Sequence, residues 1–86
     1  MKWGIVKQMH YVYMLRLVNG QYYVGETSKL EDRIRQHFQS NTKTTTRIRP
    51  KELVFYAAFK TKKKALSFEK YLKSSSGFAF RNKHLI

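Results

Sequence analysis

The segment from residue 9 to residue 25 constrains the fold most, because it is patterned as a β-hairpin. Residues 9–17 are rich in strand-forming side chains that alternate between two faces. Tyr11, Tyr13, Leu15 and Leu17 share one face, and Val12 and Met14 share the other. The dipeptide Asn19-Gly20 follows and favours a hairpin turn, since both residue types tolerate positive φ. The pattern predicts a strand over 9–17, a turn, and a returning strand over 21–25.

The next segment is patterned as a helix. Ser28 followed by Glu31 forms a capping box, which predicts a helix that ends at about Phe38 or Gln39. Its expected buried stripe consists of Leu30, Ile34 and Phe38. Arg33 and His37 are four residues apart and therefore lie on neighbouring positions of one helix face.

The second half of the chain predicts a loop, a strand and further helical structure. Residues 40–51 are polar and basic and indicate a loop, and the apolar run 53–59 indicates a third, buried strand. Thr61 is the expected cap of a helix over 62–74, and Gly77 is its expected C′ residue. The tail 78–86 is expected to form a short helix or a strap. This element order predicts an α+β fold, a small three-stranded antiparallel sheet flanked by helices.

The net charge of the chain restricts the classes of partner that it is expected to bind. The 86 residues suffice for one domain, and they carry 18 Lys and Arg against 5 Asp and Glu, a net charge of +13. Such a chain suits a polyanion, with nucleic acid as the first candidate, an anionic membrane surface as the second and a small basic ribosomal-type protein as the third. The absence of cysteine excludes disulfides and Cys-based zinc sites. We see no signal peptide and no apolar run long enough for a membrane helix, so we expect a cytoplasmic or nucleoid location.

Glu69 is the acidic residue whose position is least expected. It falls four residues after Ala65, within the apolar stripe of the predicted helix. A carboxylate in such a place costs free energy unless it is paired or binds a metal. An ion pair with Lys73, four residues on, and a metal-binding role explain it equally well at this point.

Four tyrosines cluster on the predicted hairpin, but none of them alone indicates a function. The cluster consists of Tyr11, Tyr13, Tyr22 and Tyr23. Tyrosine packs well on a strand while its hydroxyl stays hydrated, which is the simpler interpretation. Arg33 and His37, each taken alone, are ordinary residues of a helix surface.

The combination of these residues resembles the GIY-YIG nuclease family. Tyr11-Val12-Tyr13, nine intervening residues and Tyr23-Val24-Gly25 resemble the paired motif of its name. The segment 30–37 resembles the helix with an arginine and a histidine four apart, and 68–74 resembles the helix with the metal-binding glutamate. The chain looks most like the small stand-alone bacterial members and also resembles the N-terminal domain of the excision-repair nuclease. The resemblance covers about residues 10–80, so we take 1–9 as an extension and 10–86 as the nuclease-like domain.

The chain departs from the family pattern at three places. Tyr11 replaces the first glycine of the motif, both isoleucines are valines, and Phe38 follows His37 where asparagine is usual. Tyr11 removes a nominal motif residue but no catalytic group that the resemblance implies.

The resemblance implies an endonuclease that hydrolyses phosphodiester bonds. Its catalytic residues are then Tyr13, Tyr23, Arg33, His37 and Glu69. Tyr13 is the implied general base, and because a phenol has a pKa near ~10, His37 or a metal-ordered water takes its proton. Tyr23 orients the water or the phosphate, and Arg33 clamps the phosphate. Glu69 is the implied ligand of one Mg²⁺ or Mn²⁺, with no small-molecule cofactor.

The basic loop and the second helix supply the expected contacts to flanking phosphates, namely Lys43, Arg47, Arg49 and Lys73. We expect DNA with little sequence preference as the substrate, since a domain of this size has little surface for reading bases. Two alternatives remain: a nucleic-acid-binding module without turnover, or a subunit of DNA repair or recombination that needs a protein partner. A structural basic protein of the ribosome or nucleoid fits the charge but does not require the tyrosine cluster.

Overall fold

The computed structural model describes residues 8–39 and 48–86. The predicted basic loop therefore lies largely outside the described residues, as does most of the predicted N-terminal extension. The elements in chain order are β1 (His10–Leu17), β2 (Tyr22–Thr27), α1 (Leu30–Phe38), β3 (Pro50–Phe59), α3 (Lys62–Leu72) and α4 (Ser75–His84). Within the described residues, no helix has both the length and the apolar character needed to cross a membrane.

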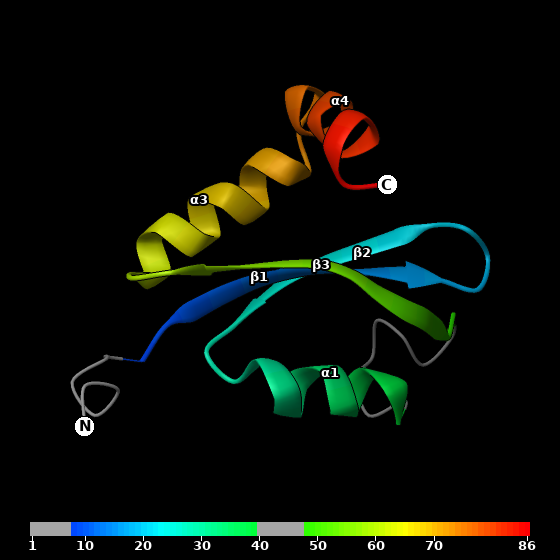
Figure 1. Ribbon diagram of the computed structural model, residues 1–86, viewed down its shortest axis with the longest axis horizontal. Coiled ribbons are helices and arrows are strands. Elements are labelled where there is room, and N and C mark those ends of the chain that lie inside the picture. The colour runs from blue at the N-terminus through cyan, green and yellow to red at the C-terminus, as the bar shows by residue number, and fades with distance from the viewer. Residues whose placement is uncertain (1–7, 40–47) are drawn as a thin grey trace.

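The three strands form one antiparallel sheet with β1 at its centre. The strand order is β2-β1-β3. Figure 1 shows α1 on one face of the sheet, and α3 followed by α4 on the other. The α+β fold class expected from the sequence is thus confirmed.

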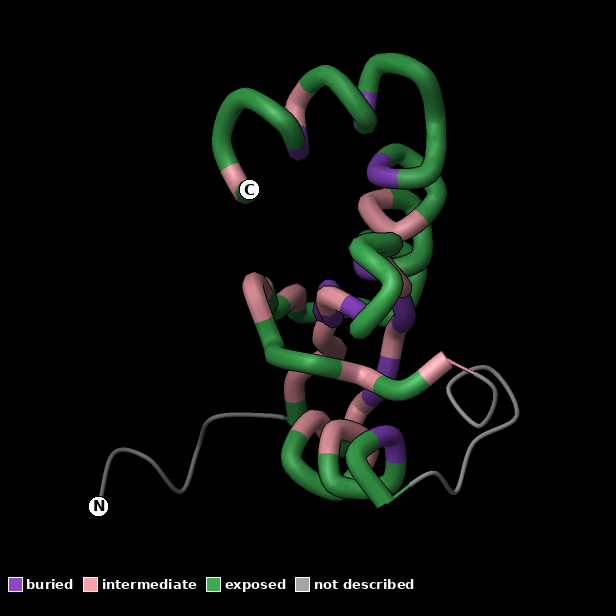
Figure 2. Tube along the Cα trace, turned by 90° about the vertical axis from the view of Figure 1, so that its right-hand side faces the viewer, coloured by how far each residue is buried: buried purple, intermediate pink, exposed green. Residues whose placement is uncertain are grey.

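The alternation along β1 divides the core into two parts, as predicted. On the α1 side, Tyr13, Leu15 and Leu17 are buried with Leu30 and Ile34 packed against them. On the α3 side, the buried residues are Val12, Met14, Val24, Ala65 and Leu72. In Figure 2 the buried segments lie in the sheet and on helix turns, while most of the C-terminal helix is exposed.

The hairpin is confirmed, and its loop sets the register. The amide of Leu17 donates to the carbonyl of Gln21 at 2.8 Å, and the amide of Gly20 donates to the carbonyl of Leu17 at 2.9 Å. Gly20 has φ +88°, a conformation that glycine adopts without a steric penalty. The loop therefore contains three residues, 18–20, and the pairing places Tyr13 opposite Gly25.

The third strand differs from its prediction in length and in burial. It begins at Pro50, three residues earlier than expected, and it lies at an edge of the sheet. Proline lacks the backbone N–H that donates to a neighbouring strand, and the first residue of an edge strand can do without this hydrogen bond. The apolar run 53–59 was wrongly predicted to be buried, since no residue of β3 is buried.

The first helix ends where predicted but begins one residue later than predicted. Its N-cap is Lys29, and no side chain caps the helix, so the capping box predicted at Ser28 is wrong. The Thr27 hydroxyl accepts from the Lys29 amide at 3.0 Å just before the helix. The buried residue in the last turn is His37, whereas Phe38, expected in the stripe, is exposed.

The C-terminal half confirms one predicted cap and corrects another. The Thr61 hydroxyl accepts from the Lys64 amide at 3.2 Å, and Ala65 and Leu72 form the buried stripe of α3. Gly77 does not end that helix. Instead, the Ser74 hydroxyl accepts from the Gly77 amide and caps α4, the helix formed by the tail.

Candidate active site

Three aromatic rings from β1, β2 and α1 pack together on the α1 face of the sheet. The ring centroids of Tyr13 and Tyr23 are 6.1 Å apart, and those of Tyr23 and His37 are 5.0 Å apart. Tyr13 and His37 meet edge to face at 5.6 Å. The structure thus brings together three of the residues that the sequence suggested as catalytic.

The Tyr13 hydroxyl lies 2.8 Å from Nε2 of His37, and this hydrogen bond is buried. Tyr13 is 0% exposed and His37 is 1% exposed. When the imidazole is neutral and Nε2 carries no proton, the phenol donates and the ring accepts. The contact therefore gives the phenolic proton of Tyr13 a direct path to His37.

Gly25 makes room for the Tyr13 ring. A Cβ atom at this position would lie 2.6 Å from the Tyr13 hydroxyl oxygen and 2.7 Å from the adjoining ring carbon. Both separations are shorter than real contacts allow, so glycine is required by close approach rather than by backbone conformation. The final glycine of the second motif half is thus part of the site.

The electrostatic surroundings favour the neutral forms of both partners. Burial raises the pKa of Tyr13 well above its usual range, and Tyr23 raises it further, whereas the nearby Arg33 lowers it by hydrogen bonding and charge. Burial lowers the pKa of His37, and the charge of Arg33 lowers it further. At neutral pH the cluster therefore holds a protonated phenol against a neutral imidazole.

Arg33 connects this buried cluster to the surface. It is half-buried, acts on both Tyr13 and His37, and lines two polar cavities of about 190 and 180 Å³. A phosphate in either cavity would meet a guanidinium that is suited to clamping two of its oxygens.

Glu69 lies on α3 and thus on the side of the sheet opposite α1 (Figure 1). Its side chain is 19% exposed, and its Oε2 accepts from Nζ of Lys73 at 2.9 Å. The ion pair considered from the sequence is therefore present. The interactions described above do not join Glu69 to the tyrosine cluster, so its metal-binding role stays a prediction.

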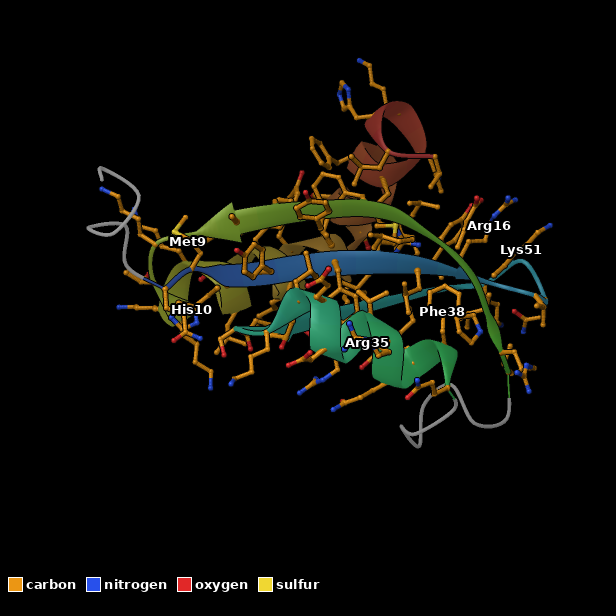
Figure 3. All side chains as sticks on the ribbon, turned by 60° about the horizontal axis from the view of Figure 1, so that its bottom comes forward. Met9, His10, Arg16, Arg35, Phe38 and Lys51 are labelled. Atoms are coloured by element: carbon orange, nitrogen blue, oxygen red, sulfur yellow. The ribbon has the colours of Figure 1, made fainter. Side chains whose placement is uncertain are left out.

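Two of the four predicted phosphate-binding residues lie among the described residues. Lys43 and Arg47 lie outside the described residues. Arg49 is exposed just before β3, and Lys73 is the C-cap of α3. In Figure 3, Lys51 near the start of β3 and His10 at the start of β1 mark opposite ends of the sheet.

Comparison with known proteins identifies the family. The family model described as the GIY-YIG catalytic domain matches residues 9–83. The chain belongs to the GIY-YIG family. It is 32% identical over 65 residues to the UPF0213 protein YazA of Bacillus subtilis, a match that covers 74% of this chain and 66% of that protein. It is 39% identical over 66 residues to a UPF0213 protein of Clostridium perfringens, covering 76% and 71%.

A solved structure supports the same relationship. The solution NMR structure of a UPF0213 protein from Bacillus halodurans is 30% identical, with a TM-score of 0.52, and covers 87% of this chain and 83% of that chain. The chain spans just under two thirds of the Bacillus subtilis and Bacillus pumilus relatives, at 66% and 65% of their lengths. The GIY-YIG fold is therefore established.

Glu69 supplies one carboxylate ligand, so a divalent metal at this place would need phosphate oxygens of the substrate as further ligands. Among residues 8–39 and 48–86, no three His, Cys, Asp or Glu side chains come together as a metal site. One carboxylate, waters and phosphate oxygens of a bound substrate make an ordinary Mg²⁺ environment. Glu69 is partly exposed, and it would exchange Lys73 for the metal.

The sequence interpretation missed three residues that share a cavity with Arg33, namely His10, Glu26 and Lys62. The common face of His10 and Glu26 follows from the hairpin register, which the residue pattern alone does not give. Once Val12 is paired with Glu26, His10 and Glu26 follow the alternation of Val12 and Val24 and point to the same face.

Proposed function

We propose that this GIY-YIG protein is a metal-dependent endonuclease that hydrolyses phosphodiester bonds in DNA with little sequence preference. The single observation that carries the proposal is the buried 2.8 Å contact between the Tyr13 hydroxyl and His37 Nε2. Any buried phenol needs a hydrogen-bond acceptor, but an imidazole acceptor can in addition take up the phenolic proton, which a tyrosine acting as general base has to lose.

The reaction begins when Arg33 binds the phosphate beside the cluster. Tyr23, which is partly exposed, orients the attacking water. Tyr13 takes a proton from this water as its own phenolic proton passes to His37, so no free phenolate has to form in a buried site. Arg33 then stabilises the additional negative charge of the pentacovalent phosphorus.

Glu69 is the residue that would hold a divalent ion, Mg²⁺ or Mn²⁺. Such an ion neutralises charge on the phosphate and on the leaving oxygen. Lys73, at present the partner of Glu69, would then be available to a flanking phosphate.

Binding without turnover is the competing function, and one observation favours it. Tyr13 is fully buried, so hydrolysis requires an opening that brings water and phosphate to its hydroxyl. A module that only binds DNA would use the same basic surface and would not need this access.

Incubation with supercoiled plasmid and with branched DNA decides between the two functions. We expect cleavage with Mn²⁺ or Mg²⁺, none with EDTA, and a loss of about 100-fold or more in Arg33→Gln. Retained DNA binding with no cleavage of either substrate at any metal concentration would contradict the nuclease proposal and support the binding module. Cleavage at the parental rate in Arg33→Gln would contradict the role proposed for Arg33 or trace the activity to a contaminating enzyme.

A further inference from the structure

A small polar cavity lies at the end of the sheet where β1 begins and β2 ends. It has a volume of about 190 Å³ and is lined by His10, Glu26, Thr27, Ser28, Arg33 and Lys62. Figure 3 shows His10 at this end of the sheet. Lys62 comes from the first turn of α3 and Arg33 from α1, so the cavity opens where the two faces of the sheet meet.

His10 and Glu26 are placed like two ligands of one ion. Nδ1 of His10 is 3.6 Å from Oε2 of Glu26, which is too long for a good hydrogen bond. This nitrogen is buried and has no hydrogen-bond partner among the described residues. The Glu26 side chain is only 12% exposed. Leaving such a nitrogen unpaired is costly, which points to a ligand that would occupy the space between the two side chains.

We propose that His10 and Glu26 hold a divalent cation in this cavity, beside a phosphate bound by Arg33. Two atoms that each lie about 2.1 Å from one ion are at most about 4.2 Å apart, so a separation of 3.6 Å lies within reach of a shared ion. An imidazole nitrogen with a carboxylate and hydroxyl or water oxygens suits Mn²⁺ better than Mg²⁺, which prefers oxygen ligands alone.

The charges around the cavity make this cation dependent on an anion. Arg33 and Lys62 line the same space, and their charges repel a cation that enters by itself. A phosphate removes the repulsion, because its oxygens can meet both the basic side chains and the metal. Mn²⁺ and phosphate should therefore each raise the affinity for the other.

The inference rests on the proposed function for the identity of the anion, a phosphate of nucleic acid, but its test needs no catalysis. Paramagnetic Mn²⁺ broadens NMR signals of nearby nuclei, and the three histidines supply separate ring signals. We expect the His10 signals to broaden at lower Mn²⁺ concentration than those of His84. Addition of inorganic phosphate or a short thymidine oligonucleotide should lower the required concentration several-fold.

Two matched variants locate the ion. Glu26→Gln should abolish the selective broadening of His10 at micromolar Mn²⁺, whereas Glu69→Gln, which removes a carboxylate of α3, should preserve it. Broadening of His10 that survives in Glu26→Gln, or that disappears in Glu69→Gln alone, would overturn the proposal. It would also be overturned if Mn²⁺ had no selective effect, which is expected if His10 and Glu26 form only an ion pair.

The two proposals fail separately. DNA cleavage by the parent protein with unchanged Mn²⁺ broadening in Glu26→Gln would overturn the cation site and leave the nuclease standing. Selective Mn²⁺ binding that Glu26→Gln abolishes, in a protein that cleaves no DNA, would establish the cation site and contradict the nuclease.

Discussion

Tyr13 and Gly25 face each other across β1 and β2, and the tyrosine hydroxyl and ring lie over the space that a Cβ atom at Gly25 would fill. This arrangement turns the phenol toward His37, with which it forms the buried hydrogen bond. The absence of a side chain at Gly25 of β2 thus makes room for Tyr13 of β1, the proposed general base.

Replacing Gly25 with alanine should displace the Tyr13 ring. We expect a loss of about 1–3 kcal/mol in the free energy of unfolding, as is usual for an overpacked site, together with loss of cleavage. Urea titration and a cleavage assay check this. The control is Ala58→Gly at an exposed position of β3, which should lose stability but not cleavage at a temperature where it is folded. An unperturbed and active Gly25→Ala variant would show that Tyr13 has room to spare.

The lowered pKa of His37 predicts loss of stability in mild acid. The unfolded chain binds a proton at His37 near pH 6.5, while the folded protein binds it only at lower pH, so the unfolded state gains protons first. The free energy of unfolding should therefore fall as pH drops below about 6.5. His37→Gln should reduce this pH dependence, whereas His84→Gln on the exposed part of α4 should leave it unchanged. Equal slopes in all three proteins would contradict the burial of a neutral His37.

The first turn of α3 should be more stable with fewer positive charges. Lys62, Lys63 and Lys64 lie at the end of the helix where its dipole is also positive, and no acidic residue is present there. Lys63→Glu should stabilise the fold by about 0.3–1 kcal/mol at low salt and should weaken DNA binding. Lys83→Glu should instead destabilise the protein, because Lys83 lies in the last turn of α4, where the helix dipole favours a positive charge.

Thermal melts and DNA titrations at two salt concentrations measure both effects. The parent protein should lose DNA affinity steeply as salt rises, and Lys63→Glu should have a shallower salt dependence. A parent titration that is flat between low and high salt would contradict electrostatic binding. Unchanged DNA affinity in Lys63→Glu would exclude this end of α3 from the interface.

Variants of Glu69 and Lys73 distinguish a metal-binding role of Glu69 from a surface ion pair. If it binds the metal, Glu69→Gln should remove divalent-dependent cleavage while the protein stays folded and binds DNA at least as well. Lys73→Gln removes the same ion pair but keeps the carboxylate, so it should retain cleavage at saturating DNA. If the pair is only structural, both variants should lose a few tenths of a kcal/mol and keep activity. Full activity of Glu69→Gln with Mg²⁺ would therefore exclude the metal role.

Periodicity predicted the elements of the fold, because the alternation of Val12, Tyr13 and Met14 and the stripe of Ala65 and Leu72 directly reflect burial. What it did not supply was the position of β3 in the sheet. An apolar run indicates a strand, but it does not indicate whether the strand lies at the centre or at the edge of the sheet. Because β3 pairs with β1 on one side only, its residues stay at least partly exposed.

The structure packs the sequence candidates Tyr13, Tyr23 and His37 together, but the sequence left the hairpin register open. A two-residue turn at Asn19-Gly20 would pair Tyr13 with Glu26, whereas the three-residue loop pairs it with Gly25. That shift by one residue turns Glu26 away from Tyr13 and toward the side of His10. No local signal in the sequence distinguishes the two loops, so the cavity around His10 became visible only in three dimensions.

Replacing Tyr13 with phenylalanine tests the nuclease proposal most directly, because it removes one buried hydroxyl and keeps the ring that packs in the core. The matched control is Tyr56→Phe, which removes a hydroxyl from a tyrosine that is 54% exposed on β3. With plasmid DNA and Mn²⁺, the proposed roles predict a loss of cleavage of about 100-fold or more in Tyr13→Phe, with unchanged DNA binding and a folded protein, and parental cleavage in Tyr56→Phe. Cleavage at the parental rate by a folded Tyr13→Phe would show that the hydroxyl facing His37 is structural.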